Sequence, residues 1–90
     1  MSYPEQYDEF AKVTYEMLHL HKVKAKAYGA NAIGATGFYG IVVRMSDKVQ
    51  RLLTLSKNTA PLSETIEDTL LDLASYAVIG VIWLRGKWGK

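Results

Sequence analysis

The chain has 90 residues, of which 49% are hydrophobic and 11% aromatic, a composition that excludes a disordered protein and indicates one small globular domain over residues 1–90. It has no cysteine, which excludes a disulfide framework and cysteine-ligated zinc or iron–sulfur centres. A net charge of +2 is too small to predict binding to duplex nucleic acid through bulk electrostatics.

No segment predicts a membrane partner. The first ten residues are polar and acidic, unlike a signal peptide, and the longest apolar run, Ala77 to Leu84, is far shorter than the ~20 residues of a membrane span. We therefore expect a protein of the cytoplasm.

A first helix is predicted from Pro4 to about Lys26. Proline is favourable in a first helical turn, and Gly29 follows the predicted end. The apolar residues at helical spacing are Phe10, Val13, Met17 and Leu20. Lysines at 22, 24 and 26 are typical of a solvated helix end. Residues 28–37 hold three glycines without sustained periodicity and are predicted to form a loop.

A second helix is predicted from about Phe38 to Ser56, followed by a break over Lys57–Pro61. The residues expected on its core side are Val42, Met45, Val49, Leu52 and Leu53.

A third helix is predicted to begin after Ser63 as N-cap and to end at about Leu84. The residues expected on its core side are Ile66, Leu70, Leu73, Ala74 and Ala77. Its second half, AVIGVIWL, is apolar nearly all round, so we expect a homo-oligomer through this helix, with a dimer as the default. A β-strand over 79–84 is the weaker alternative. The predicted fold is all-α, a three-helix domain with a long helical hairpin completed by oligomerisation.

Charged residues form one stripe on each hairpin helix. Arg44, Asp47, Lys48 and Arg51 recur at i, i+3, i+4 and i+7, and Glu64, Asp68 and Asp72 recur at i, i+4 and i+8. Facing each other, the stripes would hold a divalent cation and a phosphate chain. The alternatives are an ordinary solvated face, or salt bridges that only lock the hairpin.

Three segments carry a resemblance to a known family: KAYG, GIVVRMSDKVQRL and ETIEDTLLDLASYA. In this order they resemble the nucleotide-modification-associated family of the first type, small α-helical proteins of many bacteriophages and some bacteria, over roughly residues 17–82. The chain departs from that family at Ala27, where the family usually has an acidic residue. A more distant similarity is to MazG-type all-α nucleotide pyrophosphohydrolases, whose second acidic pair is absent here.

The resemblance implies binding of a phosphorylated or cyclic nucleotide in the host cytoplasm. It also implies a magnesium-dependent phosphohydrolase with Asp47, Asp68 and Asp72 as catalytic residues. The expected metal ligands are Asp47, Glu64, Asp68 and Asp72, and the expected nucleotide contacts are Tyr28, Gly29, Arg44, Lys48, Arg51 and Tyr76. Two alternatives stay open: a sponge that sequesters a nucleotide immune signal without turnover, and a purely structural oligomer.

Overall fold

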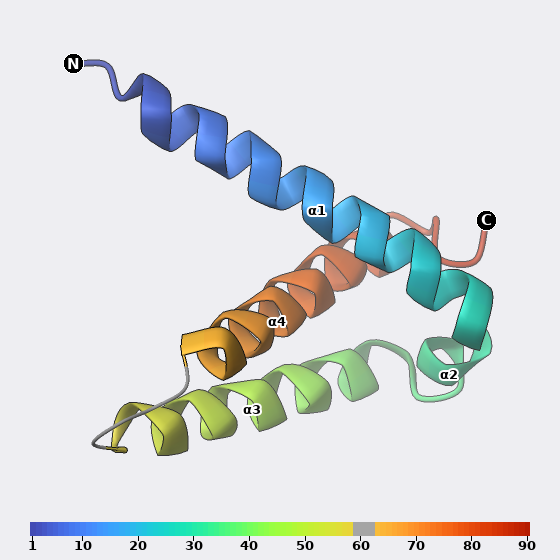
Figure 1. Ribbon diagram of the computed structural model, residues 1–90. Helices are drawn as coiled ribbons and strands as arrows, with labels where there is room; N and C mark the ends of the chain where they lie inside the picture. The colour runs from blue at the N-terminus through green and yellow to red at the C-terminus, as the bar shows by residue number, and fades with distance from the viewer. Residues whose placement is uncertain (59–62) are drawn as a thin grey trace.

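The computed structural model describes residues 1–58 and 63–90, and the side chains of all of these except Ser63 and Glu64. The described chain is all-α, as predicted, without a strand, so the strand alternative is wrong (Figure 1). The helices are α1 (Pro4–Tyr28), α2 (Asn31–Gly34), α3 (Gly37–Ser56) and α4 (Ser63–Leu84). The predicted N-cap side chain of Ser63 and part of the predicted break over 57–61 lie outside the described residues. None of the described helices is long and apolar enough to cross a membrane.

The three long helices begin and end close to their predicted positions, but the glycine-rich segment is not entirely a loop. It contains the single helical turn α2, after which the Ala35 amide donates to the Asn31 carbonyl at 2.8 Å. Gly29 ends α1 with φ at 67°, a left-handed conformation that strongly favours glycine. The prediction of a continuous loop failed because four residues are too few to show a helical period.

The helices α3 and α4 form an antiparallel hairpin (Figure 1). Ile41 of α3 is fully buried. A Cβ atom added to Gly80 of α4 would lie 3.7 Å from both Ile41 and Phe38, an ordinary van der Waals distance, so α4 packs closely on α3 here with room for a methyl group. Buried Thr69 donates from its hydroxyl to the Thr65 carbonyl at 2.7 Å and accepts a hydrogen bond from Arg51 Nε at 3.3 Å.

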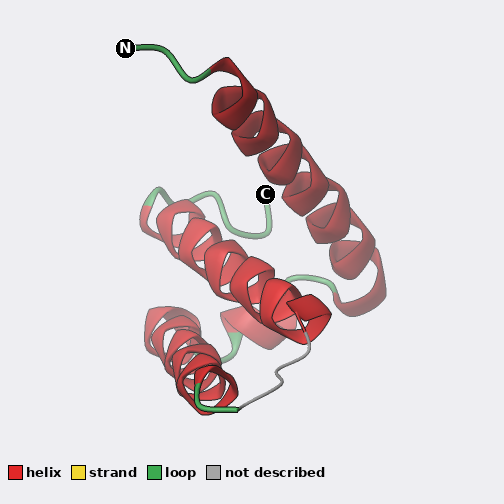
Figure 2. Ribbon diagram, turned by 60° about the vertical axis from the view of Figure 1, so that its left-hand side comes forward, coloured by secondary structure: helices red, strands yellow, loops and turns green. Residues whose placement is uncertain are grey.

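The helix α1 packs against the hairpin only in part. It crosses α4 and its N-terminal part extends beyond the other helices (Figures 1 and 2), and none of its residues is buried. The C-terminal tail returns to its other end: Trp88 Nε1 donates to the Ala30 carbonyl at 3.0 Å, and the Trp88 ring lies 5.8 Å from that of His21. The tail therefore fixes the end of α1 relative to α4.

The predicted core side of α3 is only partly right for the single chain, because Met45 and Leu52 are half-buried but the other three predicted residues are exposed. Val42, Val49 and Leu53 are exposed by 44%, 41% and 50%. The residues that are buried or half-buried toward α4 are Ile41, Met45, Lys48, Leu52 and Leu55. Periodicity alone assigns Lys48 to solvent, whereas here it is half-buried and forms an ion pair with Asp72 of α4.

The predicted core side of α4 needs the same correction. Leu70 and Ala77 are exposed, whereas Thr69, Ile79 and Gly80 are buried. The segment Ala77 to Leu84, predicted to be apolar nearly all round and covered by a partner chain, is thus buried on one side within the chain.

Candidate ligand-binding site

A pocket of about 390 Å³ lies where the end of α1, α2, α3, α4 and the C-terminal tail meet. Its volume falls within the range of small-molecule sites, roughly 300–1,000 Å³. The residues that line it are Leu20, His21, Lys24, Ala25, Tyr28, Gly29, Ala32, Ile33, Arg44, Leu71, Asp72, Ser75, Tyr76, Ile79 and Trp88.

Asp72 links three helices at this pocket. Its Oδ2 atom lies 3.1 Å from Lys48 Nζ of α3, and its Oδ1 atom lies 3.4 Å from Lys24 Nζ of α1. Burial alone would raise the pKa of the Asp72 carboxyl, but the hydrogen bonds and positive charges of Lys48 and Lys24 outweigh it and hold that pKa below its usual value. The carboxylate is therefore ionised at neutral pH and engaged by two cations.

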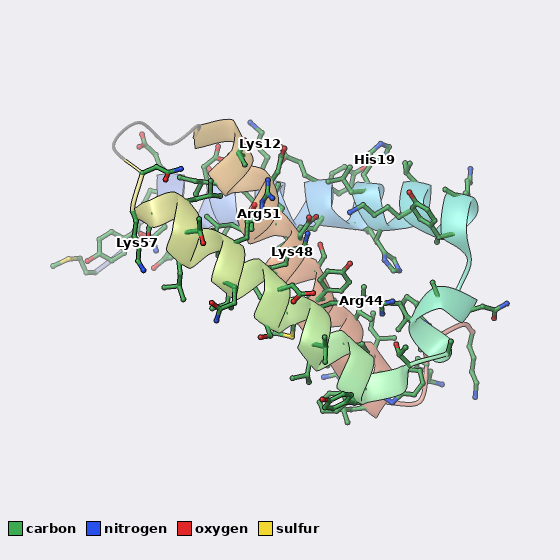
Figure 3. The ribbon with its side chains drawn as sticks, turned by 90° about the horizontal axis from the view of Figure 1, so that it is seen from below. Lys12, His19, Arg44, Lys48, Arg51 and Lys57 are labelled. Carbon is green, nitrogen blue, oxygen red and sulfur yellow. The ribbon has the colours of Figure 1, made fainter. Side chains whose placement is uncertain are left out.

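Arg44 enters the pocket from α3. Its Nη2 atom donates to the Ala32 carbonyl at 3.2 Å, which fixes the side chain against α2. Its Nη1 atom is buried and has no hydrogen-bond partner among the described residues. Figure 3 shows Arg44, Lys48 and Arg51 following one another along α3. Buried donors in folded proteins nearly always have partners, and this guanidinium nitrogen is a donor that the described residues leave unsatisfied.

Aromatic rings supply much of the remaining lining. Tyr28 comes from the end of α1, Tyr76 from α4 and Trp88 from the tail, with the imidazole of His21 beside Trp88. Tyr28 is 73% exposed, so its ring has a face available to a ligand. Such rings stack on flat heterocycles at a cost of few rotatable bonds.

Five of the predicted site residues line this one pocket: Tyr28, Gly29, Arg44, Asp72 and Tyr76. Lys48 is joined to it through Asp72. Arg51 instead donates to Thr69, and Asp47 and Asp68 are exposed and are not among the described residues that line the pocket. The structure thus brings together the arginine, the tyrosines and one of the carboxylates.

The described side chains do not by themselves fit a magnesium ion. Among them, no three His, Asp or Glu residues lie close enough together to hold a metal. Both oxygens of Asp72 face lysines, and cations in these positions compete with a metal. The predicted ligand Glu64 has its side chain outside the described residues, and the magnesium site stays a prediction.

Lys24 and Trp88 are among the pocket residues that were not predicted from the sequence. Lys24 was assigned to a solvated helix end, although it lies one helical turn before Tyr28, a spacing that places both on the same side of α1. Trp88 reaches the pocket through a hydrogen bond to Ala30, 58 residues earlier in the chain. No local pattern in the sequence indicates such a long-range contact.

The chain matches none of the protein-family models, curated proteins or solved structures with which it was compared. The resemblance to the nucleotide-modification-associated family therefore remains a prediction, and the function has to be argued from the pocket.

Proposed function

We propose that this protein binds a phosphorylated nucleotide in the pocket between α1, α3 and α4. The observation that carries the proposal is the buried Nη1 atom of Arg44, which has no partner among the described residues. A guanidinium presents several N–H donors in a planar fork that matches phosphate oxygens. Its other nitrogen is already held by Ala32, so the side chain is positioned before any ligand arrives.

The charge of the pocket supports an anionic ligand. Lys24 and Arg44 line it, and Lys48 is bound to Asp72 at its edge. Against these three cations, Asp72 is the one carboxylate among the described lining residues. The excess positive charge favours phosphate, and both lysines can turn from Asp72 toward a ligand because each reaches it through a flexible stem.

The rings of Tyr28, Tyr76 and Trp88 support a ligand that also carries a flat base. A nucleotide combines a phosphate for Arg44 with a flat base for these aromatic side chains. Binding without turnover is better supported than hydrolysis, because Asp72 is the pocket's one described carboxylate and is engaged by two lysines. Hydrolysis would need further acidic groups in the pocket to hold a metal.

The proposal is tested by calorimetric titration with canonical, modified and cyclic nucleotides, with and without magnesium. We expect at least one to bind and Arg44→Ala to weaken its binding roughly ten- to hundredfold, since a hydrogen bond to a charged group contributes about 1.5–3 kcal/mol. Arg51→Ala is the matched control: this arginine is on the same helix but hydrogen-bonds to Thr69, and its loss should change affinity less than threefold.

Recovering each nucleotide after heat denaturation distinguishes binding from turnover. Intact recovery supports non-catalytic binding, and cleaved product supports the phosphohydrolase instead. Absence of binding across the panel, or equal losses in the Arg44 and Arg51 variants, would overturn the assignment of the pocket.

A further inference from the structure

The α3–α4 hairpin has one side that is mainly apolar, with the exposed Glu67 at its edge, one helical turn before Leu70. On α3, Val42, Val49 and Leu53 are exposed apolar residues at i, i+7 and i+11, and on α4, Leu70, Val81 and Leu84 repeat at i, i+11 and i+14. At 100° per residue, each set falls on one side of its helix. We call these six residues the open face.

The two halves of the open face lie on the same side of the hairpin. The charged residues of both helices share the opposite side, because Lys48 bonds to Asp72 there and Arg44 and Asp72 line one pocket with Lys24 of α1. Each helix of an antiparallel pair has a line of residues that contacts the other helix. If the apolar residues of both helices are rotated from this line by a similar angle in the same sense, viewed from the N-terminus of each helix, they lie on the same side of the pair. Figure 2 shows α1 beside α4 on the side away from α3, and the six residues of the open face are 41–71% exposed.

The chain exposes far more surface than a monomer of its size. Its accessible surface is 7139 Å² at a mass of 10.1 kDa, whereas the scaling for folded monomers gives about 5,300 Å². Its radius of gyration is 14.9 Å, against roughly 12 Å for a compact domain of this length. The buried hydrophobic residues among those described are only Ile41 and Ile79. A core of this size does not offset the conformational entropy of ordering the chain.

The excess of roughly 1,800 Å² includes the exposed surface of α1, and it is comparable with the area that one subunit buries in an obligate homodimer, about 1,000–2,500 Å². The sequence periodicity points the same way, since it assigns Val42, Val49 and Leu70 to a core that the single chain does not complete. A mainly apolar face is best covered by an apolar partner surface, and a second open face is one with the same length and chemistry.

We infer that the open face binds the open face of a second copy of this chain, so that two α3–α4 hairpins form a four-helix bundle. The contact is isologous and closes after two subunits, because each copy offers the same face to the other. The two pockets then lie on the outer sides of the bundle, beside α1, where they remain accessible to a nucleotide. This arrangement does not depend on the proposed ligand.

The test is the mass of the unchanged protein by multi-angle light scattering at micromolar concentration. We expect twice the 10.1 kDa of one chain. A folded species of 10.1 kDa would overturn the inference and would assign the open face to a different protein. A trimer or larger assembly would also overturn the two-fold closure.

Two valines on α3 provide a matched pair of variants that locates the contact. Val49 and Val43 are each 41% exposed, but only Val49 is on the open face. We expect Val49→Glu to abolish the dimer, with loss of helical circular dichroism if folding and association are coupled, and Val43→Glu to remain a helical dimer. Equal behaviour of the two variants, whether both stay dimeric or both dissociate, would show that the open face is not the interface.

Discussion

Asp72 has two roles: its carboxylate lines the pocket, and it also forms ion pairs that connect the helices. It holds Lys48 of α3 at 3.1 Å and Lys24 of α1 at 3.4 Å, and so connects both helices to α4. Because its side chain is 34% exposed, solvent screens these pairs, and their contribution to stability is of the order of 1 kcal/mol or less.

We predict that Asp72→Asn lowers stability at pH 7 by up to ~1 kcal/mol. The folded pKa of Asp72 lies below its usual value, so the stabilisation is present above the unfolded pKa of about 4 and is lost as the pH falls through the folded pKa. Melting temperatures measured from pH 7 to pH 2 should therefore converge for parent and variant at the acidic end.

Asp68→Asn is the control for this titration, since Asp68 is exposed and is not among the described pocket-lining residues. Its effect on stability should be small at every pH. A rise in the melting temperature of the parent with magnesium, absent in Asp72→Asn, would instead support the predicted metal site.

Arg44 differs from Asp72 because part of its charge is buried without a partner. Removing the guanidinium loses one hydrogen bond to Ala32 but also removes the desolvation cost of Nη1, about 1–3 kcal/mol. We predict that Arg44→Met changes the free energy of unfolding by less than ~1 kcal/mol, as measured by denaturant titration. A loss above ~2 kcal/mol would mean that Arg44 has a structural role rather than one in binding.

At the scale of the helices, Gly80 lies where α4 packs against Ile41 and Phe38 of α3. A Cβ atom there would make ordinary contacts of 3.7 Å with Ile41 and Phe38. We predict that Gly80→Ala is neutral or stabilising by up to ~1 kcal/mol, because alanine favours the helix, whereas Gly80→Leu costs about 2 kcal/mol or more by forcing the helices apart. Thermal unfolding followed by circular dichroism measures both changes.

Gly29→Ala provides the contrasting case. Nothing lies within 4 Å of a Cβ atom at Gly29, but its φ of 67° strains any other residue. The variant should lose about 1–2 kcal/mol although its side chain meets no atoms. Equal tolerance of alanine at Gly80 and Gly29 would contradict the assigned cause at both positions.

The bounds of α1, α3 and α4 were predictable because they depend on local signals, such as Pro4 in a first turn and Gly29 after a last one. Which side of each helix faces inward was not fully predictable. It depends on contacts such as Lys48 with Asp72, between residues 24 positions apart, which a periodic pattern cannot distinguish from two solvated charges. The same limit applies to the site. The sequence singled out Arg44 and Asp72 as members of charged stripes, but only the folded structure shows that they line one pocket with Trp88.

At the scale of the whole molecule, the thin core of one chain means that folding and association should be a single process. The described buried hydrophobic residues are Ile41 and Ile79, and six of the exposed large apolar residues of the hairpin form the open face. A dimer that unfolds directly to separated chains becomes more stable as the protein concentration rises, by mass action.

We therefore predict that the melting temperature depends on protein concentration. A tenfold increase should raise it by about 4 °C, because the corresponding 1.4 kcal/mol is divided by the unfolding entropy of two chains of this length. Scanning calorimetry from ten to several hundred micromolar measures the shift. Val43→Glu should show the same slope as the parent, since this residue is not on the open face. A melting temperature independent of concentration, with a single cooperative transition, would mean that one chain folds alone and that its exposed apolar surface has another use.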